Sequence, residues 1–208
     1  MLPFTAEQFH AVFARYNEAI WPVQIAAYAA GAATVVLLFV RPCHADRAIA
    51  WILGGLWLWT GAAYHGLYFA GINRAAYLFA GLFVLQAALL VWHAPQLRFA
   101  KASKPATGLG AALVVYAAIL YPLVGLAAGH GYPATPMFGV TPCPVTLLTF
   151  GLLLLAPSAP RSLFAIPLLW SLIGGSAAIL LDVPQDWPLL VAGPLTVALL
   201  LSDRRERS

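Results

Sequence analysis

Residues 20–40 read IWPVQIAAYAAGAATVVLLFV and contain no charged side chain. An α-helix rises about 1.5 Å per residue, so about 20 apolar residues cross the hydrocarbon core of a bilayer, which is about 30 Å thick. The run ends at RPCHADR, residues 41–47, where arginine returns to the sequence. This stretch predicts a transmembrane helix with a basic loop at its carboxyl end.

The composition of the whole chain agrees with that prediction. Of 208 residues, 62% are hydrophobic and only 9% are charged, and the mean hydropathy is +0.85. Soluble domains have about a quarter of their residues charged, because a surface in water needs those groups. The composition therefore excludes a soluble globular protein and a disordered chain. Two cysteines are too few for a disulfide framework.

Further apolar runs follow, separated by polar or Pro/Gly-rich breaks. They cover residues 48–70, 76–95, 107–129, 139–157, 163–181 and 188–202. Together with 20–40, they predict one all-α transmembrane domain over residues 1–208 with seven transmembrane helices. The run at 139–157 has few clean helical residues after Pro144. We therefore expect that helix to be short, or to follow a non-helical stretch, FGVTPCP, that enters the membrane.

The first residues predict a short amphipathic helix at about 4–16. Thr5 and Gln8 fit a capping box at its start. Phe9, Val12, Phe13 and Tyr16 then share one face at helical spacing. We expect this helix to lie on the membrane surface, with a lid over a site as the alternative.

The basic residues predict the orientation. Seven crossings place nine of the eleven Lys and Arg residues on one side of the membrane, namely Arg41, Arg47, Arg98, Lys101, Lys104, Arg161, Arg204, Arg205 and Arg207. Cytoplasmic loops are enriched in Lys and Arg, so the N-terminus is expected outside and the C-terminus in the cytoplasm. The lipid bilayer is the expected partner. A continuous basic surface with readout residues is missing, so nucleic-acid binding is not expected.

Polar residues near the outer ends of these helices form the candidate site. We expect a small solute to be bound there by Glu18, His65, Asn73, Arg74, His130, Tyr132, Gln185 and Asp186. A pocket for a small molecule needs only such hydrogen-bonding and aromatic groups, which favours a transporter or permease. A plainer interpretation is also open, in which the histidines are interfacial residues and Glu18, Arg74 and Asp186 form outer ion pairs.

Two alternatives use the same sequence differently. His65, His130 and Cys143 are ligand types for a transition metal or haem, although their spacing matches no metal motif. An accessory membrane subunit is the other alternative, and a homo-oligomer stays open. Motifs such as G-x-S-x-G and H-E-x-x-H do not occur, so no catalytic residue is assigned and an enzyme is the weaker expectation. Otherwise no cofactor is expected.

Four stretches carry a resemblance to a known family. They are PFTAEQFHAVFARYNEAIWP, YHGLYFAGINRAAYLFAGLFVLQ, GHGYPATPMFGVTPCPVTLLTFGLLLL and IPLLWSLIGGSAAILLDVPQDW. Together they resemble a family of small bacterial polytopic inner-membrane proteins of unknown function, sometimes labelled permease-like. The resemblance implies a multi-pass protein of the bacterial inner (cytoplasmic) membrane. It supplies no activity and no catalytic residues.

Overall fold

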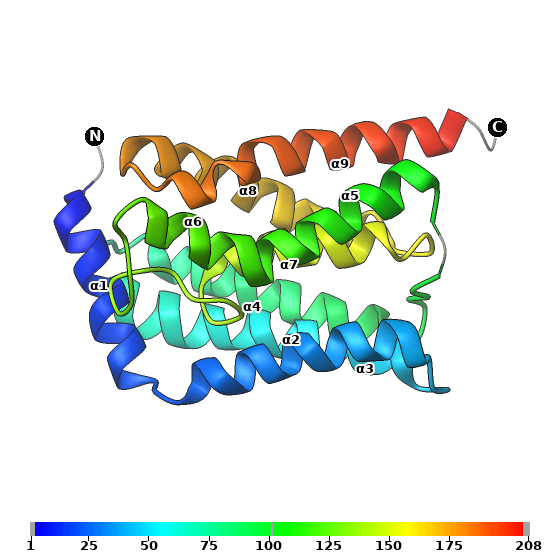
Figure 1. Ribbon diagram of the computed structural model, residues 1–208, viewed down its shortest axis with the longest axis horizontal. Helices are drawn as coiled ribbons and strands as arrows, with labels where there is room; N and C mark the ends of the chain where they lie inside the picture. Colours follow the sequence, from blue (N-terminus) through cyan, green and yellow to red (C-terminus); the bar gives the residue numbers. More distant parts are fainter. Residues whose placement is uncertain (1–2, 101, 206–208) are drawn as a thin grey trace.

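The structure, a computed structural model, describes residues 3–100 and 102–205. Lys101 and Arg207, two of the basic residues that predicted the orientation, lie outside the described residues, and the side chains of Arg204 and Arg205 are not described. Within the described ranges every regular element is helical, as the sequence predicts. Long helices run side by side along the longest axis, and α1 lies across one end of the bundle (Figure 1).

The helical elements follow the predicted runs closely. The α-helices are α1 (Ala6–Ala19), α2 (Val23–Val40), α3 (Ala45–Trp59), α4 (Ala76–His93), α5 (Lys104–Val115), α6 (Tyr121–Ala127), α7 (Pro142–Leu154), α8 (Ser162–Leu180) and α9 (Pro188–Arg205). Two π-helical segments, η1 (Thr60–Tyr68) and η3 (Tyr116–Leu120), continue α3 and join α5 to α6, and two 3₁₀ turns are η2 (Phe69–Gly71) and η4 (Pro184–Asp186). The apolar pattern of the sequence does not predict the π-helical segments.

Five helical segments of the described chain are long and apolar enough to cross a membrane. They are Val23–Val40, Ala76–His93, Lys104–Ala127, Ser162–Leu180 and Pro184–Ser202. The predicted run at 48–70 is helical too, but its α-helical part ends at Trp59, where the wider turns of η1 begin. The run at 139–157 yields the short apolar helix α7, as its proline-rich start led us to expect.

Helix α1 has the predicted cap, and its apolar face packs against the rest of the protein. The Thr5 hydroxyl accepts from the Gln8 backbone, and the Gln8 side chain accepts from the Thr5 backbone, which is the predicted capping box. Val12, Phe13 and Tyr16 are buried inside the protein. The apolar face therefore packs on protein, because the aromatic side chains of the neighbouring η1 and η2 cover it; a position of the helix on the membrane surface stays a prediction.

Helix α7 forms the centre of the bundle. All of its residues, from Pro142 to Leu154, are buried, and it runs between the other helices in Figure 1. The hydroxyls of Thr146 and Thr149 donate to backbone carbonyls one turn earlier. The indole of Trp57 on α3 donates to the Thr149 hydroxyl at 2.7 Å. The helix thus buries an apolar surface all round while its polar side chains find partners inside the protein.

Two glycines let α5 approach α7 closely. A Cβ added to Gly110 would lie 2.8 Å from the backbone oxygen of Gly151, and one added to Gly151 would lie 2.8 Å from that of Gly110. Real Cβ atoms essentially never approach so closely. Small residues at such crossings bring two helix backbones together inside a membrane, where packing replaces the hydrophobic effect as the attraction between helices.

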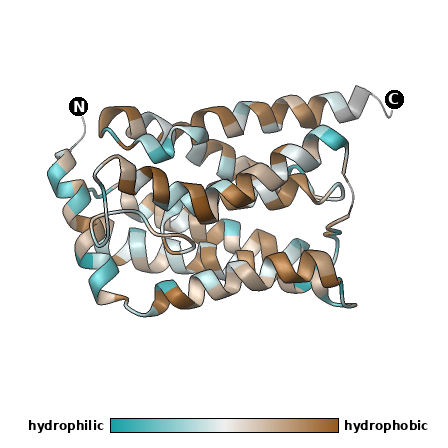
Figure 2. Cartoon of the chain, in the orientation of Figure 1, coloured by the Kyte–Doolittle hydropathy of each residue, from teal (hydrophilic) through white to brown (hydrophobic). Residues whose placement is uncertain are grey.

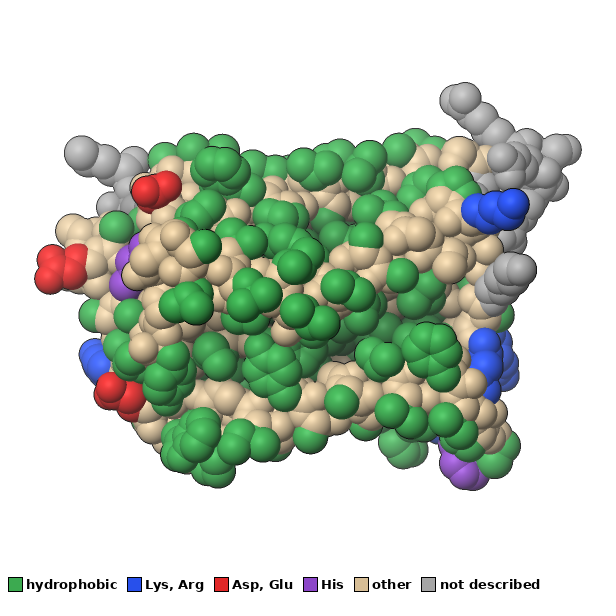
Figure 3. All heavy atoms as spheres, viewed as in Figure 1, with side chains coloured by type: hydrophobic (Ala, Val, Ile, Leu, Met, Phe, Trp, Pro, Cys, Tyr) green, Lys and Arg blue, Asp and Glu red, His purple; other side chains and the backbone are tan. Residues whose placement is uncertain are grey.

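The surface is divided into an apolar middle and polar ends. Figure 2 shows hydrophobic residues along the bundle and hydrophilic ones on α1 and at the ends. Large apolar side chains face outward along the middle, including Leu85, Val115 and Leu172, which are 49%, 48% and 61% exposed. Figure 3 shows Asp and Glu at the α1 end and most of the visible Lys and Arg at the opposite end. Such a surface would aggregate in water and suits lipid, so the chain is a membrane protein.

The α5–α7 contact predicts that alanine substitutions at two glycines of α5 differ in their effect on stability. Gly110→Ala should destabilise the protein by about 1–3 kcal/mol, because backbone atoms of α7 must move. Gly108→Ala meets nothing within 4 Å and should be neutral or slightly stabilising, since alanine favours helix over glycine. Thermal unfolding of both variants in detergent measures the difference, and equal midpoints would show that the close approach does not contribute to stability.

Candidate functional site

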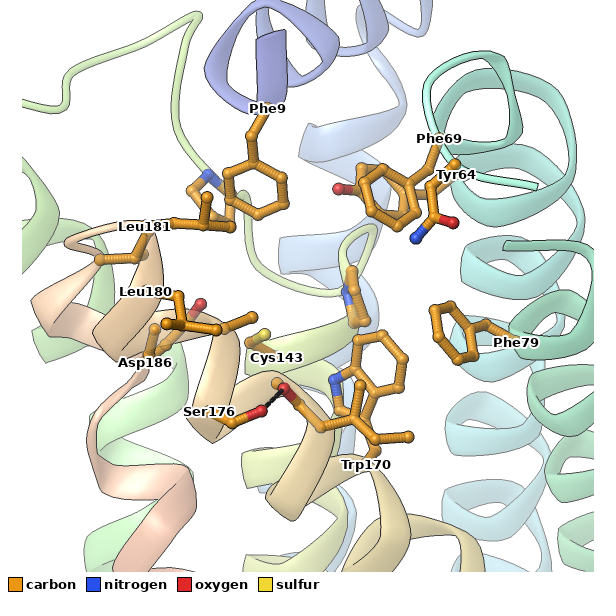
Figure 4. A pocket seen from close by; sticks show the side chains of 18 of the residues that line it. Phe9, Tyr64, Phe69, Phe79, Cys143, Trp170, Ser176, Leu180, Leu181 and Asp186 are labelled. Carbon is orange, nitrogen blue, oxygen red and sulfur yellow. Dashed lines mark hydrogen bonds between the residues drawn. The ribbon is translucent and has the colours of Figure 1, made fainter. Parts of the chain in front are cut away.

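A cavity of about 150 Å³ lies near the α1 end of the bundle. Its walls come from α1, η1, η2, α4, α8 and the start of α7, segments that are far apart in the sequence. Figure 4 shows Phe9, Tyr64, Phe69, Phe79 and Trp170 around this space, with Leu180 and Leu181 on another side. The lining is mostly aromatic and aliphatic, with a few polar groups, which is the usual composition of a small-molecule pocket.

His65 occupies the middle of an aromatic cluster in the wall. Its ring centroid lies 4.7 Å from that of Phe83, 5.0 Å from that of Trp170 and 5.7 Å from that of Phe79. All of these contacts are edge-to-face, the arrangement that aromatic rings prefer. The π-helical η1 carries both Tyr64 and His65 into this region. The packing fixes the imidazole between α4 and α8.

The polar atoms of this cluster are buried without satisfying partners. Neither ring nitrogen of His65 has a hydrogen-bond partner among the described residues, and the same is true of the indole nitrogen of Trp170. A buried polar atom without a partner costs about 1–3 kcal/mol. Since His65 and Trp170 both line the cavity, a molecule inside it is the natural partner for these groups.

Asp186 contributes a carboxyl group to the same cavity. It belongs to η4, between α8 and α9, and is only 3% exposed. The hydroxyl of Tyr121 donates a hydrogen bond to it, and the Cys143 thiol at the start of α7 lies beside it. Nearby, the Tyr116 hydroxyl donates to the backbone oxygen of Gln185 at 3.0 Å. The segment η3, which begins at Tyr116 and leads directly into Tyr121, thus anchors η4.

Helix α1 and the segment 128–141 close the end of the bundle over the cavity. The hydroxyl of Tyr16 donates to the backbone oxygen of Val140 at 2.7 Å, and the indole of Trp59 donates to that hydroxyl at 2.8 Å. The side-chain amide of Asn17 donates to the backbone oxygens of Pro133 and Thr135, both at 2.7 Å. These bonds satisfy backbone groups of a segment without regular structure, which otherwise could not be buried.

A pair of histidines joins the same two segments near the surface. His10 of α1 and His130 stack with ring centroids 4.4 Å apart. The Nδ1 atom of His10 lies 3.2 Å from the backbone oxygen of Ala134. Burial lowers the pKa of His10 below 6.5; the bond to Ala134 opposes this shift, and the neighbouring His130 adds to it. The position of His10 between α1 and the segment 128–141 thus favours its neutral form.

The predicted solute-binding residues do not all converge. His65, Asn73 and Asp186 line the cavity, as does Cys143. Gln185 is buried but is not part of the lining, and His130 stacks on His10 outside the lining. The remaining predicted residues, Glu18, Arg74 and Tyr132, are exposed. The alternative interpretation as outer ion pairs is wrong for the described residues, whose one ion pair is Arg41–Asp46 at the opposite end.

The predicted metal ligands are also separated. Within residues 3–100 and 102–205, no group of three or more His, Cys, Asp or Glu side chains could hold a metal ion. His65 and Cys143 share the cavity lining, whereas His130 belongs to the stacked pair with His10. The structure therefore does not assemble His65, His130 and Cys143 into one site.

Two residues of the site were missed by the sequence analysis. Neither Trp170 nor Tyr121 was predicted, because tryptophans of membrane proteins are commonly found in the aromatic belt at the membrane surface. A signal for Trp170 was present, because it lies in the middle of the run 163–181 and not at an end, where a belt residue belongs. For Tyr121 the sequence holds no such signal, since its partner Asp186 is far away along the chain.

Comparison with known proteins identifies a family but no activity. The pattern of a family of unknown function (DUF6064) matches residues 6–208, nearly the whole chain. No curated protein and no solved structure matches the chain.

The histidine pair predicts that acid weakens the docking of α1. Because the pKa of folded His10 is below its ordinary value of 6.5, the unfolded chain takes up the proton more readily. The contribution of neutral His10 to the free energy of unfolding is therefore complete above about pH 6.5 and decreases as the pH falls toward the lowered pKa. Thermal unfolding between about pH 7.5 and 5 should show a steeper loss for the natural protein than for His10→Gln. Identical pH profiles would contradict this account.

Proposed function

Because the chain belongs to this family of unknown function, we propose its function from its own site: it is a membrane permease whose small solute binds in the cavity beneath α1. The observation that carries this proposal is the cavity itself, in which buried nitrogens of His65 and Trp170 have no hydrogen-bond partner among the described residues. Hydrogen bonds from a solute would remove the cost of burying them.

The size and lining of the cavity limit the solute. A space of about 150 Å³ holds a molecule about the size of benzene. The aromatic and aliphatic walls favour a compact, largely apolar body, and the polar groups of His65, Asn73 and Asp186 can orient its polar part. This arrangement favours a small organic solute over a sugar or a nucleotide, which would need more space and more hydrogen bonds.

The proposed permease crosses the membrane seven times. In support, consecutive helical passes alternate in direction along the bundle (Figure 1). Successive connections therefore lie at opposite ends of the bundle, as seven crossings require. The loops 41–47, 96–100, 102–106 and 158–162 meet at the end opposite α1, and they hold five of the nine Lys and Arg residues within the described ranges. The positive-inside rule then gives an outer α1 end and a cytoplasmic C-terminus. The resemblance of the sequence favours the bacterial inner membrane.

Filling the cavity should stop transport without unfolding the protein. Ala177 lines the cavity, so the added ring of Ala177→Phe should occupy the solute volume and reduce uptake at least about tenfold. Ile179 on the same helix is 63% exposed, and Ile179→Phe should leave uptake unchanged. The measurement is uptake of a panel of labelled amines, alcohols and aromatic acids into proteoliposomes that contain each variant.

The outcome of that experiment separates a permease from an accessory subunit. Uptake above that of empty vesicles, lost in Ala177→Phe and kept in Ile179→Phe, supports the proposal. No uptake of any solute by natural protein, together with stable co-purification of another membrane protein, would support the accessory subunit. Unchanged uptake in Ala177→Phe would overturn the assignment of the cavity as the site.

The topology has a separate test. Reporter domains fused after Ala102, Thr135 and Ser208 should give cytoplasmic, external and cytoplasmic signals, because the basic loops are retained inside. An external signal at Ala102 or Ser208 would reverse the orientation, and matching signals at Ala102 and Thr135 would remove a crossing.

A further inference from the structure

The carboxyl group of Asp186 is buried and has no cationic partner within the part of the chain that the structure describes. Asp186 is 3% exposed, and no Lys or Arg of the described chain forms an ion pair with it. Its neighbours are uncharged donors, the hydroxyl of Tyr121 and the thiol of Cys143. A buried carboxylate is costly unless a positive charge or several hydrogen bonds compensate it. The cavity that Asp186 lines is where such a charge can lie.

Aromatic rings surround the same space. Phe9, Phe69, Phe79 and Trp170 come from four different helical elements and border the cavity (Figure 4). The face of an aromatic ring attracts a cation, tryptophan most strongly, and the attraction increases when water is excluded. A carboxylate beside several rings is the combination that recognises an organic ammonium ion. Metal ions instead need several oxygen, nitrogen or sulfur ligands.

The charge distribution at this end of the protein is compatible with a cation. The acidic residues Glu7, Glu18 and Asp182 are exposed there, and Figure 3 shows acidic side chains on this end of the surface. Among the residues that the structure describes, only Arg15 and Arg74 oppose them at the α1 end. The exposed carboxylates at this end thus exceed the exposed arginines by one, so the surface around the cavity does not repel a cation.

We propose that the solute is a small organic ammonium ion, held by the Asp186 carboxylate and by the ring faces of Phe79 and Trp170. This inference rests on the proposed solute site and adds the chemical class of its ligand. The volume suits a quaternary or alkylated ammonium group with one short substituent. Its substituent can reach the free polar atoms of His65.

Two probes of equal shape test the charge alone. Choline and 3,3-dimethyl-1-butanol differ in a single atom, a positively charged nitrogen in place of a neutral carbon. Calorimetric titration of the full-length protein in a maltoside detergent should give choline an affinity at least about tenfold higher, because the ion pair and the ring contacts act only on the cation.

A matched pair of variants assigns that preference to one carboxylate. Asp186→Asn keeps the shape and an acceptor for Tyr121, so the protein should fold and bind both probes with equal affinity. Asp182 lies four residues earlier, is exposed and has a positive φ of 53°, a conformation that asparagine tolerates. Asp182→Asn removes the same charge from the same end and should keep the preference for choline.

The outcomes distinguish this inference from the proposed function. Equal binding of both probes to natural protein overturns the cationic ligand and leaves the solute site standing. If neither probe binds to natural protein, so that its titration matches that of the cavity-filling Ala177→Phe, the result counts against the solute site itself and so against both proposals. A preference for choline that survives in Asp186→Asn overturns the role of that carboxylate.

Discussion

The enclosure of α7 is the constraint on which the rest of the structure depends. A helix surrounded by protein on every side cannot leave a polar group to water or lipid, so its threonines bond to their own backbone. It also needs neighbours that approach closely, which the facing glycines of α5 and α7 permit. The other long helices can then form a shell whose outer surface is apolar. One short buried helix thus organises the lipid-facing ones.

The same helix explains why the cavity lies at one end. Because α7 begins only at Pro142, the bundle has no central helix between that residue and the α1 end. The irregular segment 128–141 and the aromatic face of α1 occupy this region instead. They fill it incompletely, and Pro142 and Cys143 lie in the lining of the space that remains. Ring packing around His65 stabilises the walls of this space.

Local sequence signals predicted the helices but not their neighbours. The apolar runs, the capping box at Thr5 and the proline-rich start of α7 depend on residues near in sequence, and each is found in the structure. The burial of the α1 face and the contact of Tyr121 with Asp186 depend on residues far apart in sequence. Hydropathy also cannot reveal a π-helical turn such as η1, since it changes hydrogen bonding without changing composition. For these reasons only part of the predicted solute set, His65, Asn73 and Asp186, lines the cavity.

The two ends of the bundle differ in what holds them together, and this difference bears on how the proposed permease would open. Between α5 and α7 the backbones are in contact at Gly110 and Gly151, so separating these helices would cost packing along both. Over the cavity, α1 is held by ring contacts and by hydrogen bonds from Tyr16 and Asn17 to a segment without regular structure. Water or headgroups can replace those hydrogen bonds when α1 moves, whereas separating Gly110 from Gly151 would give up close backbone packing inside the bundle. Movement of α1 with the segment 128–141 is therefore the least costly way to connect the cavity with the outside, and it leaves the α7 core intact.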